Sequence, residues 1–231
     1  METREKLEFL LFHVVFAVVA LLGLFLGKDI HFALLLLVLF YITSTIILLK
    51  LRTYDLWKEA FYFSVGLNLW MLFPDWFLAA VLGTIEFSEQ SLRVGLVSLY
   101  MLGMWSIPFT LILFIFRVLE EDYAQPTAIF FAALSGLGVF VLSEQLLPML
   151  SVWQAKNVMT LGNIALYVVP AEAALCFAVI YGFLFSRDER IHVTIVMQGS
   201  VMVFYTGALA LSFFIIEILV RNRIIQIAIS E

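Results

Sequence analysis

Seven long apolar runs, separated by short polar stretches, constrain what this chain can fold into. A helix needs about 20 predominantly apolar residues to cross the hydrocarbon core of a bilayer. Inside lipid each backbone amide must be satisfied within its own segment, so helices are the expected form. The sequence therefore predicts an all-α fold, a polytopic bundle of seven transmembrane helices. The expected spans are Phe9–Gly27, Phe32–Leu49, Ala60–Ile85, Val94–Phe116, Thr127–Leu147, Val158–Ser186 and Val193–Val220.

The composition points to the same environment. Hydrophobic residues make up 64% of the 231 positions and charged residues only 13%, whereas soluble domains carry about 45–50% and about 25%. The excess apolar surface indicates an integral membrane protein whose main partner is the lipid bilayer. A net charge of -5 argues against a nucleic-acid partner, which would require a basic patch. We expect a single integral membrane domain over residues 1–231, because linkers and low-complexity tracts are absent.

The orientation follows from the lysines and arginines of the short loops, which favour the cytoplasmic side. Alternate loops divide the 13 basic residues into eight and five. The eight are Arg4, Lys6, Lys50, Arg52, Lys58, Arg117, Arg187 and Arg190; the five are Lys28, Arg93, Lys156, Arg221 and Arg223. We therefore expect a cytoplasmic amino terminus, in a bacterial cytoplasmic or internal membrane. The segment after Arg223 is open between an interfacial tail and the end of the seventh helix.

Few residues in the sequence suit a metal or a bound cofactor. Cys176 is the only cysteine, and His13, His31 and His192 are widely spaced. A tetrahedral Cys/His site needs three or four such ligands brought together. We expect neither a metal nor a cofactor.

Asp75 is the residue that calls for an explanation, because it lies within an apolar span. Ionisable groups inside a membrane are costly and often mark functional sites. At 100° per residue, Asn68, Asp75 and Glu86 share one face of the third expected helix, which should face the bundle. Pro74 removes one helical hydrogen bond beside Asp75 and is expected to kink the helix. With apolar neighbours and no basic residue at mid-helix, we expect Asp75 to hold its proton.

Other polar groups are expected at the same level, in the outer half of the bundle. The sixth expected helix contributes Asn163, Tyr167 and Glu172, the fourth contributes Trp105, and the fifth ends near Glu144. We interpret Asp75 as the leading acid and Glu172 as its catalytic partner. The expected binding residues are Asn68, Trp105, Asn163, Tyr167, Glu86 and Glu144.

The stretch DWFLAAVLGTIE, residues 75–86, resembles the third helix of microbial rhodopsins of the proteorhodopsin kind. In that family an Asp-Trp pair is followed by a carboxylate eleven positions after the aspartate, as Glu86 follows Asp75. The family's retinal is bound by a lysine in the last helix, and Val193–Val220 contains none. The family also has the opposite orientation. The resemblance therefore implies no retinal here.

The stretch VPAEAALCF, Val169 to Phe177, resembles the Pro-x-Glu-Glu-x-x-x-Phe signature of small membrane-embedded lycopene cyclases. Pro170, Glu172 and Phe177 match this signature, and Ala173 stands in place of the second glutamate. The resemblance implies proton donation to an isoprenoid. The stretches PDWFL and YMLGMWSIPF also resemble uncharacterised bacterial polytopic membrane proteins, which imply no function.

Three classes of function stay open at this point. The first is an intramembrane enzyme or binding protein for an apolar small molecule, such as an isoprenoid, a carotenoid or a lipid. The second is a small transporter coupled to protons or cations through the carboxyl groups. The third is a structural or assembly partner, as a homo-oligomer or within a larger membrane complex, for which small-residue faces would serve helix packing.

Overall fold

A computed structural model of the protein describes residues 2–223. The segment after Arg223, which the sequence leaves open between an interfacial tail and the end of the seventh helix, lies outside the described residues. Within residues 2–223, seven helices are long and apolar enough to cross a membrane. The expected all-α bundle of seven helices is therefore confirmed. The spans are Thr3–Leu26, Ile30–Leu51, Asp55–Leu82, Met101–Asp122, Gln125–Leu150, Val168–Ser186 and Ile191–Arg223.

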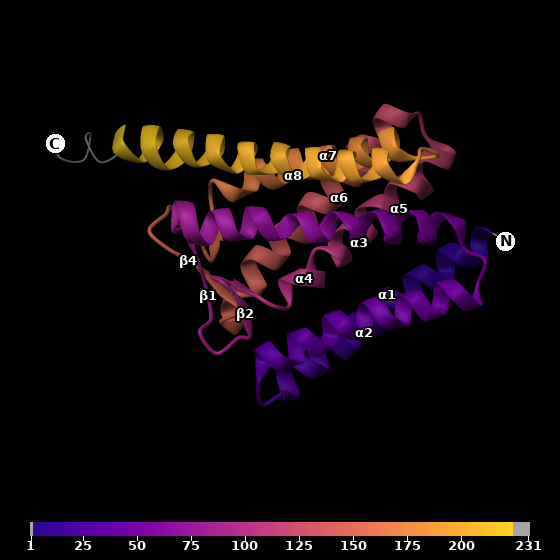
Figure 1. Ribbon diagram of the computed structural model, residues 1–231, viewed down its shortest axis with the longest axis horizontal. Helices are drawn as coiled ribbons and strands as arrows, with labels where there is room; N and C mark the ends of the chain where they lie inside the picture. Colours follow the sequence, from indigo (N-terminus) through magenta and orange to yellow (C-terminus); the bar gives the residue numbers. More distant parts are fainter. Residues whose placement is uncertain (1, 224–231) are drawn as a thin grey trace.

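The helices alternate in direction, and short strands gather at one end of the bundle (Figure 1). We call this end the strand end and the opposite one the ionic end. Several spans consist of more than one helical piece. In chain order the helices are α1 (Glu2–Leu26), α2 (Ile30–Leu51), α3 (Asp55–Trp76), η1 (Phe77–Leu82), α4 (Met101–Met104), α5 (Ser106–Asp122), α6 (Gln125–Leu146), η2 (Pro148–Leu150), α7 (Val168–Ser186), α8 (Ile191–Phe213) and η3 (Phe214–Val220).

Two of the expected helices begin later than predicted, because a β-hairpin precedes each of them. The first hairpin joins β2 (Arg93–Val94) to β3 (Val97–Ser98), and the second joins β5 (Thr160–Leu161) to β6 (Ile164–Ala165). Two-residue loops of this kind need a backbone with positive φ. Gly95 and Gly162 supply it, each with a φ of 64°. The expected helical starts at Val94 and Val158 were therefore wrong.

The third expected helix also ends early, and this changes the interpretation of Glu86. Gly83 adopts a φ of 64° and the Thr84 N–H donates to the Leu78 carbonyl oxygen at 3.0 Å, which terminates the helix. Glu86 then lies in β1 (Ile85–Phe87), not on a helix. The expected polar stripe is therefore limited to Asn68 and Asp75, which are both buried.

The chain contains an internal repeat that the helices alone do not reveal. Each unit consists of a helix, a left-handed cap residue, a strand, a hairpin and a returning helix. The first unit runs from α3 through β1 to α5, and the second from α6 through β4 (Trp153–Ala155) to α7. Gly83 and Ser151 are the two left-handed caps. The two units meet at the strand end, where β1 and β4 pair antiparallel.

Two tyrosines cross between the units in a reciprocal arrangement. Tyr100 follows the first hairpin, and its hydroxyl donates to the Val152 carbonyl oxygen, just before β4, at 2.9 Å. Tyr167 follows the second hairpin, and its hydroxyl bonds the Thr84 hydroxyl, just before β1, at 2.6 Å. Burial raises the pKa of Tyr100 to about 12 and also raises the pKa of Tyr167. Both hydroxyls therefore stay neutral at physiological pH. The tyrosine of each unit thus hydrogen-bonds the residue that precedes the strand of the other unit.

Ion pairs and caps hold the other end of the bundle. Glu120 accepts from Arg117 at 2.6 Å and from Arg187 at 2.8 Å, which joins α5 to the end of α7. A carboxylate oxygen of Glu5, on α1, accepts from the Trp57 N–H at 2.7 Å in the first turn of α3.

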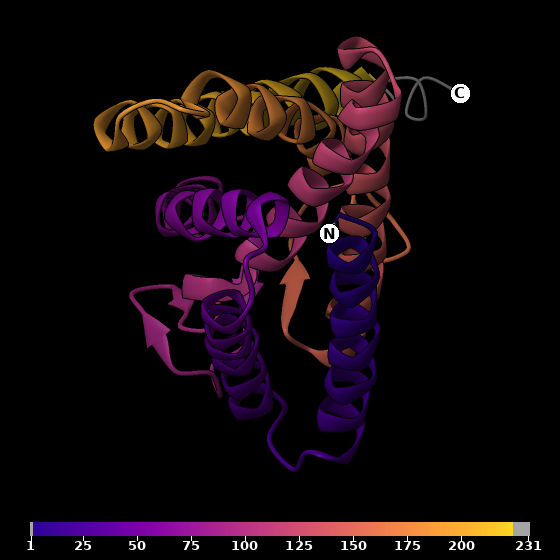
Figure 2. The same cartoon turned by 90° about the vertical axis from the view of Figure 1, so that its right-hand side faces the viewer.

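The view along the bundle shows α1 and α2 lying apart from the layer of α7 and α8, with α3 between them (Figure 2).

The crossed tyrosines predict a small, equal loss of stability in two variants. Tyr100→Phe and Tyr167→Phe should each lower the free energy of unfolding by about 0.5–1.5 kcal/mol, the net value of one hydrogen bond. Tyr181→Phe, at an exposed position, is the matched control and should change nothing measurable. Equilibrium unfolding in mixed micelles measures all three. Wild-type stability in both buried variants would contradict the role of the crossed pair.

The distribution of basic residues predicts the orientation in the membrane. Eight of the 13 lysines and arginines belong to the ionic end, which we therefore expect in the cytoplasm. In a Cys176→Ser background, Glu89→Cys at the strand end should react with an impermeant maleimide in intact cells. Glu189→Cys at the ionic end should react only after permeabilisation. The reverse pattern would show that the protein has the opposite orientation.

Candidate functional site

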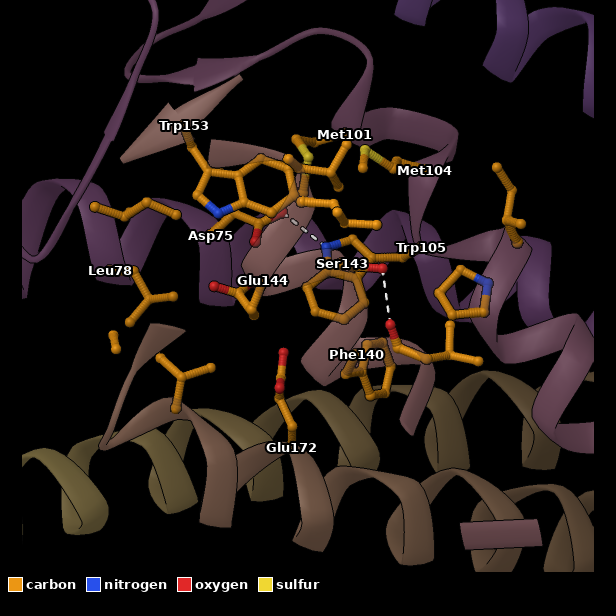
Figure 3. A pocket seen from close by; sticks show the side chains of 18 of the residues that line it. Asp75, Leu78, Met101, Met104, Trp105, Phe140, Ser143, Glu144, Trp153 and Glu172 are labelled. Atoms are coloured by element: carbon orange, nitrogen blue, oxygen red, sulfur yellow. Dashed lines mark hydrogen bonds between the residues drawn. The ribbon is translucent and has the colours of Figure 1, made fainter. Parts of the chain in front are cut away.

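A cavity of about 480 Å³ lies inside the bundle, between the two repeat units and against α1. This volume falls in the usual range of small-molecule sites, about 300–1,000 Å³. Its walls are mainly apolar, but three carboxyl groups face it, from Asp75, Glu144 and Glu172 (Figure 3). No lysine, arginine or histidine is among the described residues that line it. Three acidic groups therefore share an apolar space without a counter-cation.

Asp75 is held by a chain of contacts that begins at Asn68. Pro108 lacks an N–H, and the helix is interrupted just before it, between α4 and α5, at Trp105. The Asn68 side chain bonds backbone groups on both sides of this break. Its amide oxygen accepts from the Ser106 N–H at 3.2 Å, and its amide nitrogen donates to the Leu102 carbonyl oxygen. The Trp105 indole N–H in turn donates to Asp75 Oδ2 at 3.0 Å. Asn68 thus positions Trp105, and Trp105 positions Asp75.

The backbone around Asp75 is irregular. Pro74 lies inside α3, and the helix continues after Trp76 as the π-helical segment η1. Segments with π-helical geometry are rare and often occur at functional sites. The expected kink at Pro74 stays a prediction, whereas the change from α- to π-helical geometry occurs three residues further on. The Asp75 side chain lines the cavity with an exposure of 3%.

Glu144 lies between the other two carboxyl groups in the close view (Figure 3). All three side chains line the same cavity, so they form one carboxyl cluster. The Trp153 indole stands beside it. Glu144 is the only member of the cluster that is partly exposed.

Glu172 is the most unusual group in the cavity. Its side chain is 2% exposed, and its Oε2 atom has no hydrogen-bond partner in the described part of the chain. A buried polar atom without a partner costs about 1–3 kcal/mol. The side chain points across the cavity toward Glu144 and Asp75 (Figure 3). The fold keeps a costly acid directed into an open, apolar space.

The internal repeat explains why these groups meet. Trp105 and Glu172 occupy equivalent positions, because each lies five residues after the crossed tyrosine of its unit. Asp75 and Glu144 are also near-equivalent, each about two helical turns before its left-handed cap. The first unit therefore supplies an acid with an indole donor, and the second unit supplies two acids.

The other expected binding residues lie outside the cavity, apart from Tyr167, which lines it. Glu86 is exposed and pairs with Lys156 at 3.2 Å. Asn163 lies in the second hairpin, where its amide nitrogen donates to the Gln145 carbonyl oxygen at 3.0 Å. Asn68 bonds the backbone on either side of Trp105 and is not among the lining residues. The structure therefore brings together Asp75, Trp105, Glu144, Tyr167 and Glu172.

Several aromatic residues of the cavity were not expected from the sequence. Phe140 of α6 and Tyr205 of α8 pack against the Trp105 ring, with centroid distances of 5.6 and 6.0 Å. Trp153 enters from β4. Nothing in the apolar pattern distinguishes these rings from ordinary core residues. Among the described residues, no group of three or more His, Cys, Asp or Glu side chains is placed to hold a metal ion.

Comparison with protein families finds one match. The family described as "Domain of unknown function (DUF6989)" matches residues 72–216, more than half of the chain. The chain belongs to this family. The matched part contains all three carboxyl groups, both hairpins and the whole of α8, and it leaves out α1 and α2. Neither a curated protein nor a solved structure matches the chain.

The unpartnered Glu172 predicts a gain of stability on its removal. Glu172→Met keeps a similar volume and eliminates the unsatisfied oxygen, so it should raise the free energy of unfolding by about 1–3 kcal/mol. Glu217→Met is the matched control, because Glu217 is equally buried but accepts from the Met159 N–H at 2.8 Å. That variant should lose stability. A destabilised Glu172→Met would show that Glu172 has a structural role.

Proposed function

We propose that the protein is an intramembrane acid–base catalyst that isomerises or cyclises an uncharged, lipophilic alkene, such as an isoprenoid or another polyene. The observation that carries the proposal is the buried, unpartnered Glu172 carboxyl group, which points into an apolar cavity with two further acids and no cation. Poorly hydrated carboxylic acids of this kind are suited to donating protons.

The hydrogen bonds favour a different division of roles from the one expected from the sequence. The Trp105 N–H can only donate, so it stabilises negative charge on Asp75. Glu172 has no such donor, and an acid without donors favours its neutral, proton-bearing form. We therefore assign Glu172 as the proton donor and Asp75 as the acceptor. Glu144 shares a proton with Asp75 and returns it to Glu172 after the reaction.

The proposed reaction needs no oxidant or second substrate. The π electrons of an alkene take the Glu172 proton, so a C–H bond forms, the O–H bond breaks and a carbocation results. A second alkene of the same molecule can attack this cation and close a ring. Asp75 then takes a proton from the carbon next to the cationic centre, and the electrons of that C–H bond form a new double bond. Substrate and product are isomers.

The aromatic walls suit such an intermediate. Faces of Trp, Tyr and Phe rings attract cations, most strongly where water is excluded. Trp105, Trp153 and Phe140 lie around the three carboxyl groups (Figure 3). The resemblance of Pro170, Glu172 and Phe177 to the signature of small lycopene cyclases supports the same class of chemistry. A transporter would also need a polar path through the ionic half of the bundle, where the core is largely aromatic and aliphatic.

Deuterium incorporation tests the proposal. The protein in lipid vesicles prepared in D₂O is incubated with lycopene or geranylgeraniol, two acyclic probes. Turnover should give an isomeric product in which one deuterium replaces one hydrogen, as measured by mass spectrometry. Glu172→Gln and Asp75→Asn should abolish incorporation while the protein stays folded. Glu86→Gln, at the surface ion pair, is the matched control and should retain it. Incorporation that persists in Glu172→Gln would exclude Glu172 as the donor.

A further inference from the structure

The buried side chains of helix α1, Glu5 and Phe9, both lie near the ionic end. Near the ionic end, the Phe9 ring stacks on Phe114 with centroids 3.5 Å apart, and His13 Nε2 lies 3.1 Å from the Tyr41 hydroxyl oxygen. From Leu10 to Leu26, by contrast, no side chain of α1 is buried. The helix is therefore anchored near the ionic end and loosely packed toward the strand end.

The loosely packed part of α1 forms one wall of the cavity. Ala17, Ala20 and Leu21 line it from this side, and α6 lines it from the other with residues that include Leu146. Leu21 is 56% exposed and Leu146 is 54% exposed, although both line the cavity. The surface of the cavity is thus continuous with the outer surface of the bundle between α1 and α6.

This opening faces lipid. Ala17, Leu21 and Leu146 are apolar, and all three lie within membrane-spanning segments. The strand end, by contrast, is covered by the β1–β4 pair and the crossed tyrosines. A molecule dissolved in the bilayer meets the apolar side chains of Ala17, Leu21 and Leu146 at this opening. A charged solute would lose its hydration before reaching the carboxyl cluster.

We propose that the ligand of the carboxyl cluster enters sideways from the bilayer, through a portal between α1 and α6 lined by Ala17, Leu21 and Leu146. The ligand class is an uncharged, chain-shaped lipophile, whose leading part reaches Asp75 and Glu172 while the remainder lies in the portal. The small side chains of Ala17 and Ala20 leave room for the chain. This inference rests on the proposed function only in taking the cavity as the site of action.

Energy transfer to a fluorescent lipophile tests the portal. Trp105 and Trp153 line the cavity and serve as donors, in a background where the other three tryptophans, Trp57, Trp70 and Trp76, are changed to Phe. The acceptor is the methyl ester of cis-parinaric acid, an uncharged tetraene chain, added to phosphatidylcholine vesicles that contain the full-length protein. This background protein should show more transfer than a single transmembrane helical peptide with one central tryptophan in the same vesicles. Equal transfer would overturn the proposal.

Matched variants on the two walls decide whether the probe uses the portal. Ala17→Phe should lose most of the transfer, whereas Val18→Phe, one position away on the lipid face and outside the cavity lining, should retain it. Leu146→Ala should accelerate the rise of transfer after mixing, and Leu142→Ala, also exposed on α6 but outside the lining, should not. Because these two pairs act in opposite directions, misfolding cannot produce both results. Equal behaviour within each pair would overturn the portal.

The two proposals fail separately. Glu172→Gln should retain full transfer while it loses deuterium incorporation. If the portal variants act as expected but no probe incorporates deuterium, the portal stands and the catalytic proposal fails. If turnover is observed and Ala17→Phe leaves both transfer and turnover unchanged, the catalytic proposal stands and the portal is wrong.

Discussion

The antiparallel pairing of β1 with β4 is the interaction on which the rest of the structure depends. Four helices end or begin around these two short strands, and their non-helical backbone groups lie at the end of a bundle surrounded by lipid. Such groups require partners within the protein. The strands supply them to each other, and Tyr100 and Tyr167 tie each strand to the opposite unit. This arrangement fixes the distance between α3 and α6, and hence between Asp75 and Glu144.

The cavity beneath the strands combines features that stability alone would not favour. A buried acid without a partner, a helix interrupted at Trp105 and a π-helical segment after Asp75 each reduce regular hydrogen bonding. Elsewhere the buried Glu5 and Glu217 each accept a hydrogen bond from a backbone N–H. Departures from local rules that cluster around one space are typical of functional sites. In this protein they coincide with the residues that the two repeat units bring together.

The number of helices and the burial of Asp75 and Glu172 inside the bundle could be predicted, because they follow from hydropathy and from the cost of charge in lipid. The hairpins were missed because the residues 94–100 and 158–167 are as apolar as the helices they precede. Their signal was the pair of turns at Gly95-Leu96 and Gly162-Asn163, which hydropathy does not register. Glu86 was misplaced for the same reason, since Gly83 ends the helix only through its backbone conformation. The aromatic walls of the cavity depend on packing between the units, which no local pattern contains.

The repeat also has a consequence for how the chain acquires its structure. Each unit is a pair of helices joined by one strand and one hairpin, so its contacts are closer in sequence than those between the units and can form earlier. The cavity, by contrast, exists only after the units have met across the strands. Folding of this region thus resembles an intramolecular dimerisation, with two small hairpin-shaped modules as the partners. Helices α1 and α8 would then dock on an assembled frame, and the cavity would be the last feature of the protein to form.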